Sequence, residues 1–200
     1  MTFIEPVPES HAPESVARMY ATDREVFGHL PNFARAFSHR PEVYAAWRQL
    51  NGAIKANMDL RRYELATVAA ARRLRSSYCM LAHGSVLAKE ELLGPDATQA
   101  VVTDPRSPAA GLDEVDVAVM ELADKVAQDA GSVTQADVDR LRALGLTDAE
   151  VFDVIAAAAA RCFFSTALDA LGAQPDARYA ETLDPALRDA LTVGRPIAEA

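Results

Sequence analysis

Apolar residues recur at steps of three and four along most of the chain, which is the period of an amphipathic helix. The sequence shows no sustained apolar–polar alternation and no Asn-Gly or Asp-Gly hairpin turn, so it predicts no strand. We therefore predict an all-α fold, a compact multi-helix bundle with short connections. Predicted helices cover 14–27, 32–38, a segment that starts at 41, 60–74, a segment that starts at 76 or 77, 95–102, 112–130, 135–144, 151–171 and 184–192.

Residues that favour helix ends lie at these predicted boundaries. Gly28 follows the first helix, where a left-handed C-terminal residue is common, and Pro41 opens another helix at a position where its missing N–H costs nothing. Asp59 is a predicted N-cap, and Thr147 with Glu150 has the form of a capping box. The boundary signals and the apolar periodicity therefore agree.

The chain reads as one all-α domain over residues 1–200. Residues 1–13 contain three prolines and are expected to form an extended arm on the body or on a partner subunit, and 173–200 a C-terminal tail with a short helix. Residues 154–160 are apolar on every side and rich in alanine, which predicts a helix at the centre of the bundle. The helix from Pro41 has the apolar stripe Tyr44, Trp47, Leu50 and Ile54, with Trp47 expected in the core or the wall of a pocket.

Composition narrows the class of protein. Half of the residues are hydrophobic, enough for one buried core, and the formal net charge of −9 comes with no basic run or basic–aromatic cluster. Nucleic-acid binding is therefore not expected, and the longest apolar run, 154–160, is too short to span a membrane. The N-terminus has no cationic and apolar signal-peptide pattern, and two distant cysteines suit a reducing compartment, so we expect a soluble cytoplasmic protein.

The stretch 60–90 predicts a helix hairpin that carries the candidate chemistry. Glu64 lies on a mainly apolar stripe of the first helix, and Ser76, Cys79 and His83 share one face of the second. Around a turn near residue 75, Glu64 and His83 differ in height by roughly 4–5 Å at about 1.5 Å of rise per residue. A carboxylate–imidazole–thiol relay is therefore possible.

This arrangement suits nucleophilic sulfur chemistry. The thiolate is the reactive form of cysteine, and a helix N-terminus and a nearby imidazole both favour the anion. The ordinary alternatives are a small buried cysteine that fills the core and a core histidine whose hydrogen bonds are satisfied. Spacing alone does not decide between them.

The pattern Glu-x11-Ser-x2-Cys-x3-His, formed by Glu64, Ser76, Cys79 and His83, resembles the active-site signature of the alkylhydroperoxidase D/carboxymuconolactone decarboxylase superfamily. The peroxidase branch has Glu-x11-Cys-x2-Cys-x3-His, so Ser76 replaces the partner cysteine and the usual internal disulfide cannot form there. The segment Gly-x-Leu-Pro-Asn that starts at Gly28 and the second half of the chain are also similar to the peroxidase-related branch. The resemblance covers 28–172.

The resemblance implies a thiol-dependent peroxidase-like oxidoreductase that reduces small hydroperoxides. Cys79 would attack the peroxide, His83 would move the proton and Glu64 would orient His83. Ser76 and Tyr78 would support the site. Cys162 is either a buried helix cysteine or a distant resolving thiol for Cys79.

Alternatives remain at this stage. One is a decarboxylase, lactonase or isomerase, as in the other branch, in which Glu64 and His83 move protons on a small organic substrate. Another is a non-catalytic binding protein that has lost the paired cysteine. Zinc binding by Cys79, His83 and Glu64 lacks a fourth ligand, so we expect no metal or other cofactor. The resemblance further implies a homo-oligomer, and an external thiol as reductant.

Overall fold

The computed structural model describes residues 2–199, and across them it contains eleven α-helices and no strand. The all-α prediction is confirmed. The α-helices are α1 Glu14–Phe27, α2 Asn32–Ala36, α3 Pro41–Lys55, α4 Leu60–Arg73, α5 Ser77–Leu87, α6 Pro95–Thr103, α7 Glu114–Asp129, α8 Gln135–Ala143, α9 Asp148–Leu171, α10 Arg178–Thr182 and α11 Pro185–Leu191. Short 3-10 helices cover η1 Glu9–His11, η2 Pro108–Ala110 and η3 Ala130–Ser132.

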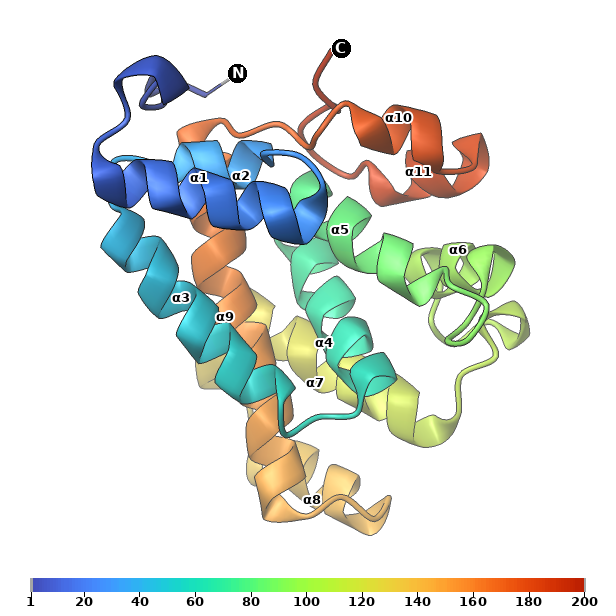
Figure 1. Cartoon of the computed structure of the whole chain (residues 1–200). Coiled ribbons are helices and arrows are strands. Elements are labelled where there is room, and N and C mark those ends of the chain that lie inside the picture. Colours follow the sequence, from blue (N-terminus) through green and yellow to red (C-terminus); the bar gives the residue numbers. More distant parts are fainter. Residues whose placement is uncertain (1, 200) are drawn as a thin grey trace.

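Helix α4 lies at the centre of the bundle and packs against α5, α7 and α9 (Figure 1). Its residues from Tyr63 to Ala71 are all buried, so α4 has no solvent-facing side along most of its length. Helix α3 runs beside α9, whereas α1 and α2 cover one end of the bundle (Figure 1). The small side chains of α4 explain this packing, because alanine lets neighbouring helices approach closely.

The predicted boundary residues act as the sequence suggests. Gly28 ends α1 with a left-handed φ of 75°, a conformation that glycine adopts without strain. The Asp59 side chain caps α4, and Thr147 and Glu150 form a reciprocal capping box at the start of α9. Leu50 differs from the prediction: it is 53% exposed, so it is not part of the buried stripe of α3.

The N-terminal arm lies on the body of its own chain. Phe3 N donates to Leu171 O at 2.8 Å and Val7 N donates to Ser38 Oγ at 2.9 Å. The arm is not wholly extended, because Glu9–His11 forms the 3-10 helix η1. In the tail the sequence pattern missed α10, a five-residue helix that has no buried residue and so no apolar stripe to reveal it.

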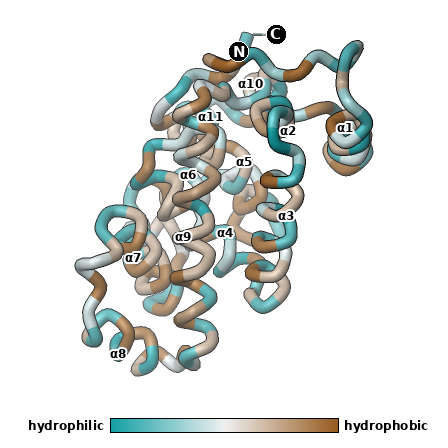
Figure 2. Tube along the Cα trace, turned by 90° about the vertical axis from the view of Figure 1, so that its left-hand side faces the viewer, coloured by the Kyte–Doolittle hydropathy of each residue, from teal (hydrophilic) through white to brown (hydrophobic). Residues whose placement is uncertain are grey.

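Helix α9 is the one helix of the described chain that is long and apolar enough to cross a membrane, by length and composition alone. An 18-residue window of α9 has a mean hydropathy of 1.6, so the apolar stretch is longer than the run 154–160, and half of this window is buried inside the protein. Ala157 and Ala158 pack in the core, and α9 contacts α3, α4 and α7 (Figure 2). These contacts explain its apolar character, and we interpret α9 as a core helix of the bundle.

Candidate active site

Helix α4 places Glu64 inside the protein. Asp59 Oδ1 accepts a hydrogen bond from Arg62 N at 3.0 Å and so starts the helix one turn before Glu64. Glu64 is 1% exposed among the apolar residues of α4, on the side that faces α5. A buried carboxylate requires hydrogen-bond or charge partners, so its neighbours define the site.

A tight turn brings α5 back alongside α4. Arg75 adopts a left-handed φ of 57°, Ser76 N donates to Ala71 O at 3.0 Å, and Arg75 N donates to Arg72 O at 3.0 Å. This pair of bonds is the Schellman pattern that closes a helix end. The reversal makes α4 and α5 an antiparallel hairpin, and Cys79 falls in the first turn of α5 as the sequence predicts.

The hairpin brings Glu64 and His83 into direct contact. His83 Nδ1 donates to Glu64 Oε2 at 2.5 Å, and Lys55 Nζ lies 3.7 Å from Glu64 Oε1. A carboxylate on Nδ1 fixes the ring orientation and leaves Nε2 as the nitrogen that can accept a proton. The register predicted from the turn is confirmed by this hydrogen bond.

The charge states of this pair follow from burial and from nearby cations. Burial alone would raise the pKa of Glu64, but His83, Lys55 and Arg161 together bring it below its ordinary value. Burial and the Arg161 charge lower the pKa of His83, against the opposing effect of Glu64. Glu64 is therefore ionised near pH 7, and His83 is neutral and able to act as a base.

Cys79 is 2% exposed, and its closest polar partner is an arginine. Arg161 Nη1, from α9, lies 3.5 Å from Cys79 Sγ. Among the described residues no hydrogen bond joins Cys79 to His83, although both line the same cavity. A proton that moves from Cys79 to His83 would therefore pass through a substrate or a water molecule.

Arg161 is 3% exposed and has no carboxylate within ion-pair distance among the described residues. Its Nη2 donates to Tyr63 Oη at 3.3 Å, and its guanidinium lies 5.6 Å from the centre of the Trp47 ring. Burial opposes its charge, but Cys79 and Tyr63 raise the pKa of Arg161 above its ordinary value. A buried guanidinium with these neighbours favours an anion at the sulfur.

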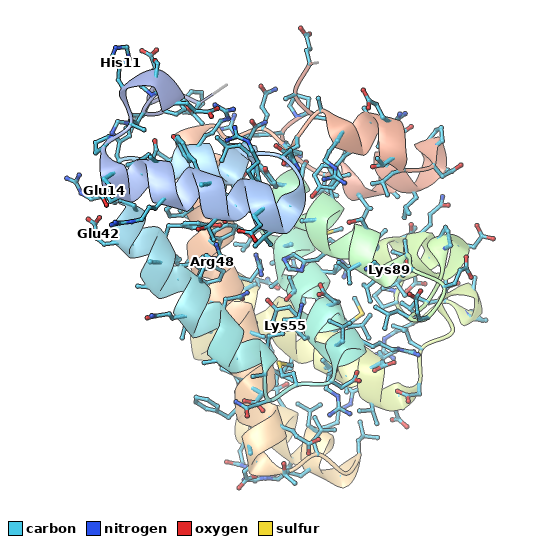
Figure 3. All side chains as sticks on the ribbon, in the orientation of Figure 1. His11, Glu14, Glu42, Arg48, Lys55 and Lys89 are labelled. Atoms are coloured by element: carbon cyan, nitrogen blue, oxygen red, sulfur yellow. The ribbon has the colours of Figure 1, made fainter. Side chains whose placement is uncertain are left out.

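These side chains meet at a cavity of about 640 Å³. Cys79, His83, Glu64 and Arg161 line one part of it, and aromatic rings line another part, including Trp47 as expected. Arg48, Lys55 and Lys89 also line the cavity, and Figure 3 shows them on α3 and just beyond the end of α5. The thiol is therefore accessible from the cavity despite its low exposure.

Tyr78 and Ser76, which were predicted to support the site, occupy different environments. Tyr78 lines the cavity, donates to the carboxylate of Asp176 and accepts from Phe33 N at 3.1 Å. Ser76 is fully buried and is not a lining residue, and its hydroxyl has no hydrogen-bond partner among the described residues. Among the described residues no hydrogen bond joins Ser76 to Cys79, so Tyr78 is better placed than Ser76 to act on a bound molecule.

Cys162 and Cys79 are both free thiols. Cys162 follows Arg161 on α9, and neighbouring helix positions point about 100° apart, so Cys162 does not share the direction that Arg161 takes toward Cys79. It does not line the cavity, and burial raises the pKa of its thiol. Its structural interpretation fits these observations better than a resolving role.

Sequence reasoning missed Arg161, although a signal was present. Arg161 occupies a position on the buried stripe of α9, between Ala158 and Phe164 and at the same steps of three and four. A single charged residue on an apolar stripe requires a buried partner. Zinc binding gains no support, because the residues that the structure describes contain no group of three His, Cys, Asp or Glu side chains that could hold a metal ion.

The bundle and its α4–α5 hairpin have the alkylhydroperoxidase D-like fold, as solved structures show. A peroxidase-related protein from Ralstonia eutropha JMP134, described as an alkylhydroperoxidase AhpD core, superposes with a TM-score of 0.78 at 21% identity over 89% of this chain and 94% of its own. Another peroxidase-related protein, from Silicibacter sp. TM1040, gives 0.73 at 21% identity over 84% and 88%. No family model and no curated protein sequence matches the chain.

A debrominase also has this fold. The C82A form of Bmp8, in complex with 2,3,4-tribromopyrrole, superposes with a TM-score of 0.73 at 17% identity over 93% of this chain and 98% of its own. At such identities the likeness establishes the fold and not the reaction. Any reaction of this chain must therefore be inferred from the side chains of its own cavity.

Proposed function

We propose that this protein is a thiol-dependent peroxidase-like oxidoreductase that reduces hydroperoxides through Cys79. One observation carries the proposal: a cysteine beside a buried guanidinium opens on the same cavity as a hydrogen-bonded Glu64–His83 pair. These groups are a nucleophile, a counter-charge, a base and a residue that orients the base. The peroxidase-related proteins with the same fold support this reaction class.

In the first step the Cys79 thiolate attacks the terminal oxygen of a hydroperoxide. The sulfur–oxygen bond forms as the oxygen–oxygen bond breaks, the sulfur is oxidised to a sulfenic acid, and the peroxide is reduced to an alcohol. His83 Nε2 takes the proton of the entering thiol or peroxide and returns it to the leaving oxygen. Glu64 holds His83 through Nδ1 in the tautomer that this transfer requires.

Two further steps regenerate the thiol. An external thiol attacks the sulfenic acid, forms a mixed disulfide with Cys79 and releases water. A second external thiol then attacks this mixed disulfide, frees the Cys79 thiol and forms a disulfide with the first external thiol. Ser76 cannot supply a resolving sulfur, and Cys162 does not line the cavity. The reductant is therefore a small thiol that can enter the cavity.

The decarboxylase, lactonase or isomerase alternative is not favoured, because the structural neighbours are peroxidase-related proteins and a debrominase. Cytoplasmic location and homo-oligomeric assembly stay predictions. The outward face of α9 carries Phe152 and Phe163, which are 67% and 48% exposed, and a second copy would cover apolar surface of this kind.

Trapping of the sulfenic acid tests the proposed function. We expect one equivalent of an organic hydroperoxide, followed by a dimedone-type reagent and mass spectrometry, to label Cys79 in the wild type. Cys162→Ser should keep the label, whereas Cys79→Ser should lose it. An unlabelled Cys79, or a label confined to Cys162, would overturn the proposal.

A further inference from the structure

The walls of the cavity have a charge opposite to that of the whole protein. The chain has a formal net charge of −9, yet the cavity is lined by five cationic side chains and only two carboxylates. The carboxylates are Glu64 and Asp176, and the cations are Arg48, Lys55, Lys89, Arg161 and Arg178. A cleft of one sign concentrates ligands of the other sign and speeds their entry.

The cations differ in how far they are already neutralised. Arg48 Nη1 lies 2.7 Å from Asp23 Oδ1, and Lys55 lies near Glu64. Lys89 and Arg178 are both exposed, and neither has an ion-pair partner among the described residues. Arg178 Nη1 lies 3.4 Å from Phe27 O and 3.1 Å from His29 Nδ1, whereas the Lys89 ammonium has no hydrogen-bond partner among the described residues. Lys89 is therefore the exposed cation of the cavity wall that is most free to meet an anion.

The inner cation is engaged differently. Arg161 contacts the Cys79 sulfur, donates to Tyr63 Oη and is 3% exposed. Lys89 is exposed, so it can meet the charged end of a ligand whose reducible end lies at Cys79. Lys89 lies ten positions after Cys79, along α5 and the turn that follows it, which corresponds to a backbone rise of about 15 Å.

Between these two points the wall is aromatic. The Trp47 and Phe164 rings stack with centroids 4.8 Å apart and an interplanar angle of 16°, and the Phe33 ring meets Phe164 edge-on at 5.8 Å. All three rings line the cavity. A wall of stacked aromatic rings favours a ligand whose middle part is flat or otherwise apolar over a strongly hydrated ligand.

We propose that the site takes an organic anion with three parts: a negatively charged end at Lys89, an apolar and flat body along the Trp47–Phe164 wall, and a reducible end at Cys79. This inference rests on the proposed function and adds the substrate class to it. A carboxylate and a phosphate ester share the charge that Lys89 recognises. Hydrogen peroxide and neutral alkyl hydroperoxides would be poorer ligands.

The test measures binding of unreactive analogues, so it does not depend on turnover. Trp47 is the chain's only tryptophan and lines the cavity, so its fluorescence reports occupancy. Wild-type protein is titrated with 4-isopropylbenzoate, 4-isopropylphenyl phosphate and the neutral 4-isopropylbenzamide in low salt. We expect at least one anion to bind severalfold more tightly than the amide, and the anion that binds better distinguishes a carboxylate from a phosphate.

A charge reversal identifies the cation. Two units of charge changed about 4 Å from a bound anion in water alter its affinity about thirtyfold. Lys89→Glu should therefore weaken anion binding about thirtyfold without affecting the amide, and about 0.5 M salt should reduce the loss. The matched control is Arg106→Glu, which makes the same change of charge at an exposed residue outside the cavity that pairs with Glu121.

Equal affinity for the benzoate, the phosphate and the amide would overturn the inference, as would an equal loss in Arg106→Glu and Lys89→Glu. These outcomes are separate from those of the proposed function. Anion binding without sulfenic acid formation at Cys79 would refute the peroxidase and keep the ligand class. Sulfenic acid formation at Cys79 without a preference for anions would refute the ligand class and keep the peroxidase.

Discussion

Replacement of Arg161 by methionine isolates the contribution of its charge to the reactivity of Cys79. Methionine keeps an unbranched apolar stem of similar length and removes the guanidinium that lies 3.5 Å from the sulfur. Opposite unit charges at that separation attract by about 1 kcal/mol in water and about 5 kcal/mol at the effective dielectric of protein sites. Because the sulfur faces a cavity, we expect a value near the lower end, about 1–2 kcal/mol.

The assay is alkylation of Cys79 by iodoacetamide, followed by mass spectrometry. Loss of this attraction removes a group that favours the sulfur anion, so the alkylation rate of Arg161→Met at pH 7 should fall about tenfold. Above pH 10, where an ordinary thiol is ionised, the wild-type and variant rates should converge. Arg161→Lys keeps the charge, and its rate should lie between the two.

Stability provides the second readout. A buried charge without a carboxylate partner contributes little to folding, and its replacement by an apolar side chain is often neutral or stabilising. We therefore expect the free energy of unfolding of Arg161→Met to equal or exceed that of the wild type. An unchanged alkylation rate at pH 7 would refute the electrostatic reasoning. An Arg161→Met rate that stays below the wild-type rate above pH 10 would indicate that the methionine side chain blocks access to Cys79.

Two further predictions concern carboxylates. Glu64→Gln keeps a partner for His83 Nδ1 but removes the charge, so peroxide turnover should fall tenfold or more with little change in the melting temperature; turnover within twofold of wild type would exclude its orienting role. Asp137 accepts hydrogen bonds from Lys125 and from Thr134, which lower its pKa to about 2. Asp137→Ala should cost about 1 kcal/mol in urea unfolding at pH 7. Because the folded pKa is the lower one, this difference should be present above pH 4 and disappear as the pH falls toward 2, whereas a difference that grows with acid would contradict it.

The sequence predicted the fold well because local signals and apolar periodicity agree. Asp59, Gly28 and the Thr147–Glu150 capping box mark helix ends whose geometry depends only on nearby residues. The Glu64–His83 contact was also predictable, since both residues belong to one hairpin and the rise per residue fixes their relative height. Short-range information was sufficient for these features.

Long-range features of the site were not predictable in this way. Arg161 reaches Cys79 from a helix 82 positions later in the sequence, and no local pattern specifies which faces of α5 and α9 meet. Similarly, Ser76 is fully buried and does not line the cavity, which its spacing from Cys79 in the sequence could not reveal. Packing between distant helices decides both outcomes.

The position of Glu64 on the most deeply buried helix has a consequence for how this fold can diversify. Its location is set by the same contacts that hold α4 among α5, α7 and α9, so a mutation that displaces Glu64 would also disturb the core. The opposite side of the cavity comes from α1, α3 and the segment between α1 and α2, which contribute less to the central packing. Mutations there can reshape the ligand space while the hairpin persists, which is consistent with one scaffold supporting both peroxidase-related proteins and a debrominase.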